Sequence, residues 1–447
     1  MLISYIKIPS ETGHENLGAE FLRKICEEKG LKVKTISNNA GSVNFAASIY
    51  PLSQKKPNII FLNHIDVVPA DDSTEWSYPP FSGTLIDGKV FGRGAFDNKG
   101  LAIIQLSAVE RFVQKAAESE LPYNVTLLSV SGEETGGATG SAIVAKQFKD
   151  IFTPAVVIGE GGSGIENINF LSKGSSYFGI SVAEKGFIWL KLACKINSDG
   201  HSSVVGSDYA TKRLVKGLYR LSNKRLPIQM NEQTTQMFRY LGKNEGGLKG
   251  FVIKHISCWI FRPFLRHQIR KNPELESVFC NKITISNLID NGSSPNQIPQ
   301  EAFALLDCRY LPDNQPDELI KSVKKILKDS VFHVSIVAQG AKQYSTTPEF
   351  FYDELAKSIQ KTFINSKVVP ILFPASNDNS YFRTSDVPVY GLNPMILDPE
   401  QIKAIHNKNE YIDLDDIENG IKVFEDFLQS VLFPENPIDS VQVKRQQ

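Results

Sequence analysis

The sequence predicts an α/β fold, a mostly parallel sheet with flanking helices into which a smaller α+β, ferredoxin-like domain is inserted. In the first third of the chain, apolar runs typical of buried strands alternate with helical patterns, as in parallel sheets covered by helices. The middle of the chain follows a strand–helix–strand–strand–helix–strand order. At 447 residues the chain is also longer than one hydrophobic core usually supports, so two domains are expected.

The first domain is predicted to be discontinuous, covering residues 1–185 and 342–447. Short apolar segments bounded by turn residues predict its strands, and a longer segment of helical period predicts its first long helix. These segments are strands at 57–63, 123–130 and 154–159 and a helix at about 101–117. Short strands and a final helix return after residue 342, which is why the domain is expected to be discontinuous.

The inserted domain is predicted over residues 186–341, with a helical insertion at about 228–275. Its other segments are strands at 187–196, 281–289, 301–311 and 331–339 and helices at about 208–221 and 316–328. The most apolar stretch of the chain, 251–264, is interrupted by charged residues and is shorter than the ~20 residues that a membrane-spanning helix needs. We interpret it as a buried or interfacial helix, and no membrane span is expected.

Charge and cysteine content exclude some partners and favour one compartment. The 49 lysines and arginines equal the 49 aspartates and glutamates in number, so no net positive field attracts nucleic acid. The five cysteines are scattered and form no CxxC pair, which argues against a disulfide framework or a thiolate metal site and favours a reducing compartment. No secretory leader is present, so a cytoplasmic location is expected; a periplasmic or secreted location stays open if a leader was removed upstream.

Three polar residues follow three predicted strands of the first domain. They are His64, Glu133 and Glu160. Because ligands of open α/β sheets collect beyond the carboxyl ends of the strands, these side chains are expected at one edge of the sheet. Asp66 lies two residues after His64 and points to the same side, where its carboxylate could accept the second ring N–H of a metal-bound histidine. An HxD pair alone is equally well explained as structural.

Two further motifs carry carboxylates. In GRGAFDNKG, Asp97 precedes the predicted helix, where it either caps the helix or bridges two metal ions with its two oxygens. In SGEETGG, Glu133 and Glu134 are adjacent, and neighbouring carboxylates repel each other unless a cation or a proton intervenes. One of them can bind a metal while the other acts as a general base. An isolated pair of glutamates is more simply explained as an exposed acidic turn.

The metal-binding candidates are stronger as a set than one by one. They are oxygen and nitrogen donors without thiolates, which fits zinc, manganese or cobalt in a hydrolytic site with two metal ions. The set comprises His64, Asp97, Glu134, Glu160 and His406, the last in AIHNKNE. Two divalent metal ions are therefore expected as cofactors, with zinc favoured.

The motifs HxD, GRGAxDxKG, GEE and GEGG and the late histidine, in this order, resemble the M20 family of metallopeptidases. This family includes glutamate carboxypeptidase, carnosinase-like dipeptidases, aminoacylase and carboxypeptidase S. The similarity covers nearly the whole chain and extends to DGHSS and NQIPQEAFALLDCRY in the inserted domain. It implies a zinc-exopeptidase-like first domain, an inserted domain that acts as a lid and in dimerisation, and a homodimer as the assembly.

The resemblance also implies how the five ligands are shared. Asp97 bridges the two metals, His64 and Glu160 complete one metal site, and Glu134 and His406 complete the other. The metals lower the pKa of a water molecule, and the resulting hydroxide attacks the amide carbonyl of the substrate.

Five further roles are implied by the same resemblance. Glu133 is the general base and Asp66 is the partner of His64. In the lid, His201 stabilises the oxyanion from a neighbouring subunit, and Asn296 and Arg309 bind substrate, with Arg309 on its carboxylate. From the residues alone, two alternatives stay open: His201 as a loop residue, and Arg309 as one half of an ion pair within its strand.

The expected function is hydrolysis of the amide or peptide bond of small substrates with a free carboxylate, either dipeptides or N-acyl amino acids. The alternative enzyme is a biosynthetic-type deacylase of N-acetyl or N-succinyl amino acids, because the sequence does not identify the specificity pocket. The alternative outside enzymes is a scaffold or binding protein that retains the fold. Such a protein is expected to have lost metal ligands, and all five are present.

Overall fold

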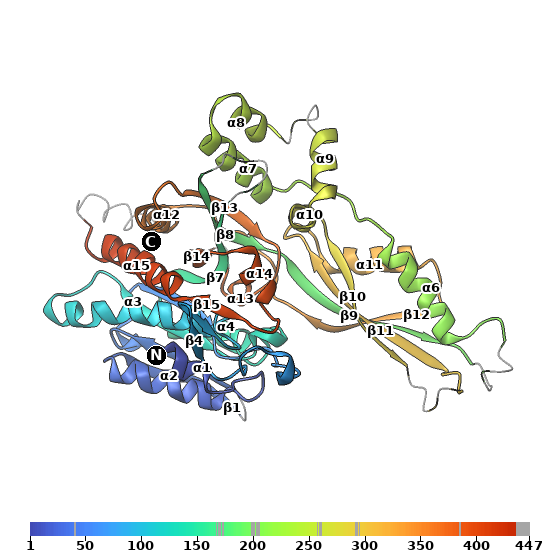
Figure 1. The fold of residues 1–447 in the computed structure, drawn as a ribbon, viewed down its shortest axis with the longest axis horizontal. Coiled ribbons are helices and arrows are strands. Elements are labelled where there is room, and N and C mark those ends of the chain that lie inside the picture. Colours follow the sequence, from blue (N-terminus) through green and yellow to red (C-terminus); the bar gives the residue numbers. More distant parts are fainter. Residues whose placement is uncertain are drawn as a thin grey trace.

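The computed structural model describes residues 1–434 except 40–41, 167, 169–170, 172–173, 198–201, 203–205, 257, 259–261, 291–293, 295 and 384–385. Two sheets dominate these residues, a large sheet of eight strands and a separate sheet of four (Figure 1). The fold class predicted from the sequence is confirmed.

The large sheet is parallel at its centre. β3 (Asn58–His64) lies between β6 (Asn124–Val130) and β7 (Pro154–Glu166) and is parallel to both. The other strands are β1 (Lys32–Asn39) and β2 (Ser42–Ser48) on one side and β14 (Val389–Ile396), β8 (Ser176–Glu184) and β13 (Lys367–Phe373) on the other. The strands predicted at 57–63, 123–130 and 154–159 are confirmed, although the third is longer than expected.

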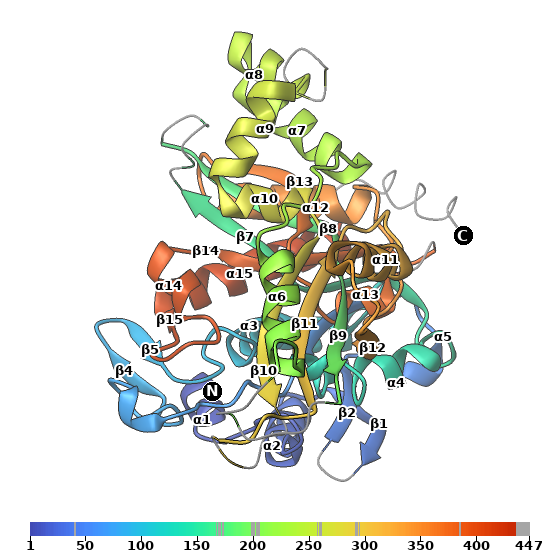
Figure 2. The ribbon, with the colours of Figure 1, turned by 90° about the vertical axis from the view of Figure 1, so that its right-hand side faces the viewer.

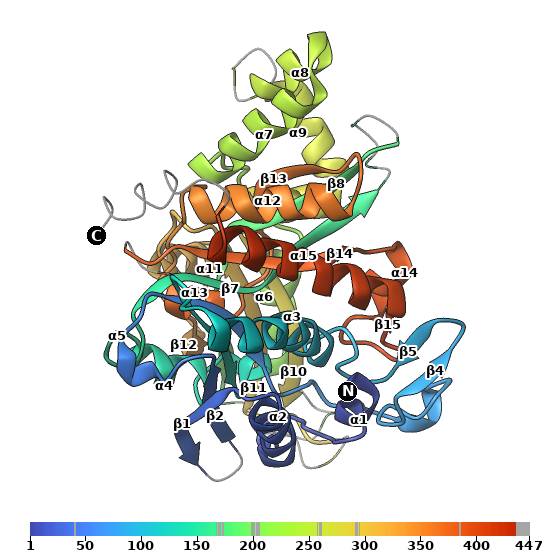
Figure 3. The ribbon, with the colours of Figure 1, turned by 90° about the vertical axis from the view of Figure 1, so that its left-hand side faces the viewer.

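Alternate residues of β3 pack into two cores on opposite faces of this sheet. Ile59 and Phe61 belong to one core, and Ile60 and Leu62 belong to the other. The first core contains residues of α2 (Asn16–Glu28), α3 (Lys99–Glu118), α12 (Phe350–Thr362) and α15 (Leu414–Leu432) (Figure 3). The second contains residues of α4 (Ser141–Lys146), α5 (Phe148–Ile151) and α13 (Asn379–Phe382). Burial on both faces explains the continuous apolar run that predicted β3.

A third sheet of short strands joins the end of the chain to the segment before α3. In it β15 (Tyr411–Asp413) pairs with β5 (Lys89–Phe91), which pairs with β4 (Thr84–Ile86). Two short helices, α1 (Leu2–Ile6) and α14 (Pro399–Ala404), complete this part of the chain. The pairing of β15 with β5 brings the segment that contains His406 next to the loop that contains Asp97.

The four-stranded sheet is antiparallel throughout, in the order β10–β11–β9–β12. Its strands are β9 (Gly186–Lys195), β10 (Lys282–Asp290), β11 (Glu301–Tyr310) and β12 (Phe332–Gln339), and its hydrophobic core includes α6 (Ala210–Ser222) and α11 (Pro316–Leu327). The predicted strand and helix order is confirmed. The division into domains at 1–185, 186–341 and 342–447 stays a prediction.

Among the described residues, four helices lie between α6 and β10 in the chain, and α8 and α9 extend beyond both sheets (Figure 2). They are α7 (Glu232–Glu245), α8 (Gly247–Lys254), α9 (Arg262–Lys271) and α10 (Pro273–Phe279). The interpretation of 251–264 as one helix is wrong, because α8 ends at Lys254 and α9 begins at Arg262. In the part of the chain that the structure describes, no helix is long and apolar enough to cross a membrane.

Candidate metal centre

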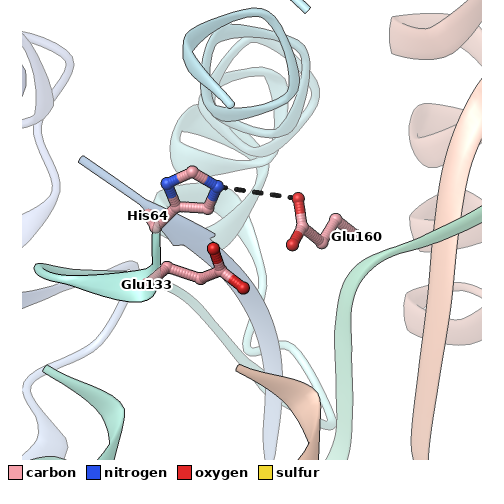
Figure 4. A group of neighbouring side chains, drawn as sticks. All are labelled: His64, Glu133 and Glu160. Carbon is pink, nitrogen blue, oxygen red and sulfur yellow. Dashed lines mark ion pairs between the residues drawn. The ribbon is translucent and has the colours of Figure 1, made fainter. Parts of the chain in front are cut away.

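Three neighbouring strands bring His64, Glu133 and Glu160 together. His64 is the last residue of β3, and Glu133 begins the short turn that follows β6. One ligand atom from each of the three residues lies within 4.8 Å of the others (Figure 4). Glu160 was expected just after its strand, but β7 continues beyond it. The register between β7 and β14 shifts at this point, and such an irregularity redirects a side chain within a strand.

Asp97 lies between two histidines, and each of its two carboxylate oxygens is close to one of them. Its Oδ1 lies 3.0 Å from Nε2 of His64, and its Oδ2 lies 3.1 Å from Nε2 of His406. The same nitrogen of His406 lies 3.2 Å from Oε2 of Glu134. Asn98, and not Asp97, occupies the N-cap position of α3, so the capping alternative for Asp97 is wrong. The residues predicted as metal ligands therefore lie together.

The pKa values of this cluster are shifted by burial and by neighbouring charges. Burial raises the pKa of Glu133 well above its usual range, and the charge of Glu160 raises it further. Burial and the charge of Asp97 raise the pKa of Glu134 to about 7. Hydrogen bonds to Asp97 and Glu134 raise the pKa of His406 to about 10. The cluster thus attracts positive charge, in the form of protons or of cations.

The donor set fits divalent metal ions. Carboxylate oxygens and imidazole nitrogens without thiolates suit zinc, manganese and cobalt. Among the described residues, the buried Oε1 of Glu134 has no hydrogen-bond partner, and such an atom calls for an ion or a water. Nδ1 of His64 lies 2.9 Å from the backbone carbonyl oxygen of Asp66, so Nε2 is the ring nitrogen that faces the other ligands.

Asp66 connects His64 to the turn that contains the two glutamates. Its carboxylate accepts hydrogen bonds from the backbone N–H groups of Glu133 and Glu134, both at 3.1 Å, and from the hydroxyl of Thr12 at 2.9 Å. The predicted contact between this carboxylate and Nδ1 of His64 is longer, at 3.5 Å. Asp66 therefore orients His64 mainly through its backbone carbonyl and orients the glutamates through its side chain.

Glu410 positions the loop that contains Asp97, a role that was not predicted from the sequence. Its buried carboxylate accepts hydrogen bonds from the backbone N–H groups of Gly94, Phe96 and Asp97 at 3.0 to 3.1 Å. Arg93, which is also buried, donates a hydrogen bond to the same carboxylate at 2.7 Å. The only sequence signal was that Glu410 ends the AIHNKNE motif.

Three asparagines contact Glu160, and they were also missed. Nδ2 of Asn98 donates to Oε2 of Glu160 at 2.6 Å. Nδ2 of Asn377 and of Asn379 donates to the backbone carbonyl of Glu160 at 3.1 and 2.7 Å. Asp378, between the last two, is buried, and burial raises its pKa to about 8. The asparagine-rich segment ASNDN was the available signal, but amides carry no charge that marks them as functional.

Arg309 lies on β11, and the ring of Phe187 lies between it and the turn that contains Glu133 and Glu134. Its Nε donates to Oδ1 of Asp307 in the same strand at 3.0 Å, which is the ion pair that the sequence left open as an alternative. Its guanidinium lies over the ring of Phe187, 5.6 Å from the centroid. Phe187 packs against Gly136 so closely that a side chain at Gly136 would meet Cζ of the ring at 2.8 Å.

The other two predicted lid residues are Asn296 and His201. The side-chain oxygen of Asn296 accepts a hydrogen bond from the hydroxyl of Ser294 at 2.6 Å, and its backbone carbonyl accepts one from the N–H of Ser202 at 3.0 Å. His201 lies outside the described residues. The roles of Asn296 and His201 stay predictions.

Comparison with known proteins gives a consistent picture. The profile of the peptidase family M20/M25/M40 matches residues 60–430. The human N-fatty-acyl-amino acid synthase/hydrolase PM20D1 is 25% identical, over 98% of this chain and 87% of its own length. The probable carboxypeptidase S-like 2 of Dictyostelium discoideum is 25% identical, over 86% of this chain and 72% of its own length. The M20 family metallo-carboxypeptidase Sso-CP2 from Sulfolobus solfataricus shares the fold, with a TM-score of 0.72, 22% identity and coverage of 97% of this chain and 98% of that chain.

Proposed function

The chain belongs to the peptidase family M20/M25/M40, and from this premise we propose that it uses two divalent metal ions to hydrolyse the amide or peptide bond of small substrates with a free carboxylate. The proposed substrates are dipeptides or N-acyl amino acids. Family membership confirms the resemblance of the motifs and makes the chain an M20-like peptidase or amidohydrolase.

The position of Asp97 between two histidines carries the proposal. One of its carboxylate oxygens lies next to His64 and the other next to His406. A carboxylate in this position can bind two cations at once, one through each oxygen, as in hydrolytic sites with two metals. A site for one cation needs only one of these oxygens.

The proposed sharing of ligands follows the contacts around Asp97. His64 lies 3.7 Å from Glu160, so these two residues are proposed to bind one metal together with Asp97. Glu134 and His406 are proposed to bind the other, again with Asp97. Divalent cations supply Lewis acidity, which lowers the pKa of water and polarises a carbonyl. Zinc is the favoured metal, and manganese and cobalt are the alternatives.

Glu133 is proposed as the general base. Its carboxylate lies beside His64 and Glu160, and burial raises its pKa, which suits a carboxyl group that takes up and returns a proton. During hydrolysis the oxygen of water bonds to the carbonyl carbon of the substrate, and Glu133 accepts the proton released by the water. The carbon–nitrogen bond then breaks, and Glu133 passes this proton to the leaving nitrogen.

The four-stranded sheet is proposed to supply the groups that bind substrate. A guanidinium binds a carboxylate through two parallel hydrogen bonds, so Arg309 suits a substrate with a free carboxylate. Asp307 already accepts hydrogen bonds from Arg309, and binding therefore requires the substrate carboxylate to share or replace this partner. Asn296 is proposed as a second substrate contact. His201 is proposed to stabilise the oxyanion across a homodimer.

The proposed substrates are of two kinds, peptides and N-acyl amino acids, and the names of the relatives support both. The human relative is named for N-fatty-acyl amino acids and the Dictyostelium relative for carboxypeptidase activity. Both kinds of substrate place a carboxylate close to the scissile amide. A biosynthetic-type deacylase of N-acetyl or N-succinyl amino acids stays the alternative. All five cysteines are free and four are buried, which supports the proposed cytoplasmic location.

The test is hydrolysis of a matched panel by the purified protein, with zinc, with manganese and after treatment with a chelator. The panel holds dipeptides and N-acetyl, N-succinyl and N-fatty-acyl amino acids, each with a free and with an amidated carboxylate. We expect two metals per chain by mass spectrometry and chelator-sensitive cleavage of the free carboxylates only. The ranking within the panel separates a dipeptidase from a deacylase. Two bound metals without any cleavage would contradict the substrate class, and a chain without metal would support a scaffold protein.

A further inference from the structure

The helices α7 to α10 form a positively charged projection on a chain whose charges balance. Residues 232–279, from the start of α7 to the end of α10, contain eight lysines and arginines and four glutamates, and the segment 239–271 holds all eight of these cations but a single glutamate. All three views of the ribbon place α8 and α9 at one end of the molecule, beyond the two sheets (Figures 1, 2 and 3). Such a concentration of one sign of charge attracts anionic partners.

At this same end, α8 presents apolar side chains to solvent. Leu248 and Phe251 are 82% and 56% exposed, and their spacing of three residues places them on one face of the helix. The opposite face packs on α7, where a side chain at Gly250 would meet the carbonyl oxygen of Gly242 at 2.3 Å. The ring of His255 lies 4.3 Å from that of Phe251, centroid to centroid. Helix packing therefore fixes the two apolar side chains toward solvent.

Exposed cations lie close in the chain to these apolar side chains. Lys249 and Lys254 are exposed on α8, and Arg266 and Lys271 are exposed on α9. The single acidic residue of the segment, Glu245, forms an ion pair with Lys249 at 2.8 Å. Exposed apolar side chains on a helix that also exposes lysine or arginine can bind the interface of an anionic bilayer, because the apolar groups enter the acyl boundary while the cations contact lipid phosphates.

We propose that the exposed part of α8 and α9, with Leu248, Phe251 and Lys254 along one side of α8 and Arg266 on α9, binds anionic lipid bilayers. Nucleic acid carries the required charge, but it offers no apolar phase for Leu248 and Phe251. A second copy of the chain would present the same positive surface, and like charges repel. The inference is independent of the substrate proposed for the metal centre.

The test is co-sedimentation of the full chain with two kinds of vesicle, phosphatidylcholine alone and equal parts of phosphatidylcholine and phosphatidylglycerol. We expect binding only to the second kind, and we expect it to be lost at high salt, because the Debye length shortens to about 3 Å at 1 M. Leu248→Ser with Phe251→Ser, and separately Lys254→Glu with Arg266→Glu, should each weaken partitioning about tenfold. Thermal unfolding should be unchanged in all variants, which shows that they fold.

A control lies outside these helices. Leu17 on α2 and Ile364 just after α12 are 64% and 81% exposed, so Leu17→Ser with Ile364→Ser removes a similar exposed apolar area elsewhere. This variant should bind vesicles as the unchanged chain does. An equal loss in the control would overturn the proposal, and so would no binding to either kind of vesicle.

Two further outcomes would assign the surface to another partner. Tight binding of duplex DNA that survives Leu248→Ser with Phe251→Ser, without vesicle binding, would indicate a nucleic-acid surface. Conversion of a dimer to a monomer by the same double substitution in analytical ultracentrifugation, again without vesicle binding, would indicate self-association. Either result would overturn the lipid proposal.

Discussion

The large sheet and the four-stranded sheet contribute to the proposed active site in different ways. At the edge of the large sheet, Asp97, in the loop before α3, lies within hydrogen-bond distance of His64 and His406. On the four-stranded sheet, Arg309 is paired with Asp307 of its own strand. The part of the site at the ends of neighbouring strands, with His64, Glu133 and Glu160, forms when that one sheet folds. A site shared by two sheets depends in addition on their relative position, which can change when a substrate binds.

The largest expected effect tests the edge of the large sheet without removing any of the proposed metal ligands. Glu133→Gln keeps the size of the side chain but cannot take up a proton, so kcat should fall about a thousandfold. Bound metal, measured by mass spectrometry on the same sample, should be unchanged because the proposed ligands are intact. Glu232→Gln, on the exposed start of α7, is the control and should retain full activity. A kcat near that of the unchanged chain would remove Glu133 from its proposed role.

The next effect tests how the loop of Asp97 is positioned. Glu410→Gln removes the charge opposite the buried Arg93, and loss of one member of a buried ion pair costs about 3–5 kcal/mol of unfolding free energy. Displacement of Asp97 should weaken metal binding about 10- to 100-fold. Denaturant unfolding and metal titration measure the two effects.

Glu276→Gln provides the control for this substitution. Glu276 pairs with Arg270 and Lys282, away from the metal centre, so its substitution should leave metal affinity unchanged. Normal metal affinity in Glu410→Gln would show that the loop of Asp97 keeps its place without this carboxylate.

A smaller effect tests the four-stranded sheet. Arg309→Ala should lower kcat/KM about 10- to 100-fold for substrates with a free carboxylate, because a charge-assisted hydrogen-bonded pair is lost. Substrates with an amidated carboxylate should be hydrolysed almost as before. Asp307→Asn is the matched control, since it releases Arg309 from its partner in the strand and should preserve hydrolysis of free carboxylates. Equal losses on both kinds of substrate would argue against binding of the carboxylate by Arg309.

The same contrast explains what the sequence could predict. His64 and the turn of Glu133 follow apolar strand segments directly, so local pattern and motif placed them at one sheet edge. Glu410 was missed because it accepts a hydrogen bond from the N–H of Asp97, 313 residues earlier, and no local pattern records such a contact. The length of β7 was underestimated because the glycines after Glu160 are typical of a turn, whereas here they lie within a strand.

The sequence also left open whether Arg309 pairs within its strand or binds substrate. The structure shows the pair with Asp307, a contact between residues two positions apart on one strand. The substrate role depends on how the two sheets approach each other, and a sequence motif does not encode that geometry. The proposed substrate-binding residues of the four-stranded sheet are therefore harder to assign than the proposed metal ligands at the edge of the large sheet.

Lys185 lies at the junction between the two regions, as the only residue between β8 and β9. Its buried Nζ donates hydrogen bonds to the carbonyl oxygens of Ser277 at 3.0 Å and Cys280 at 2.7 Å, so it connects the junction to the end of α10. Burial lowers the pKa of this lysine from 10.5 to about 7. Its substitution should have the smallest effect on catalysis, because its Nζ is hydrogen-bonded to backbone carbonyl groups at the end of α10.

Lys185→Met should instead change how stability depends on pH. Between about pH 7 and pH 10 the unfolded chain holds the proton on Lys185 and the folded chain does not, so this lysine makes the unfolding free energy rise with pH. Below pH 7 both states are protonated and its contribution is constant. Denaturant unfolding of both chains at a series of pH values should give a difference that changes only above pH 7. A difference that does not vary with pH would mean that Lys185 stays charged when folded, with its proton retained by the two carbonyl groups.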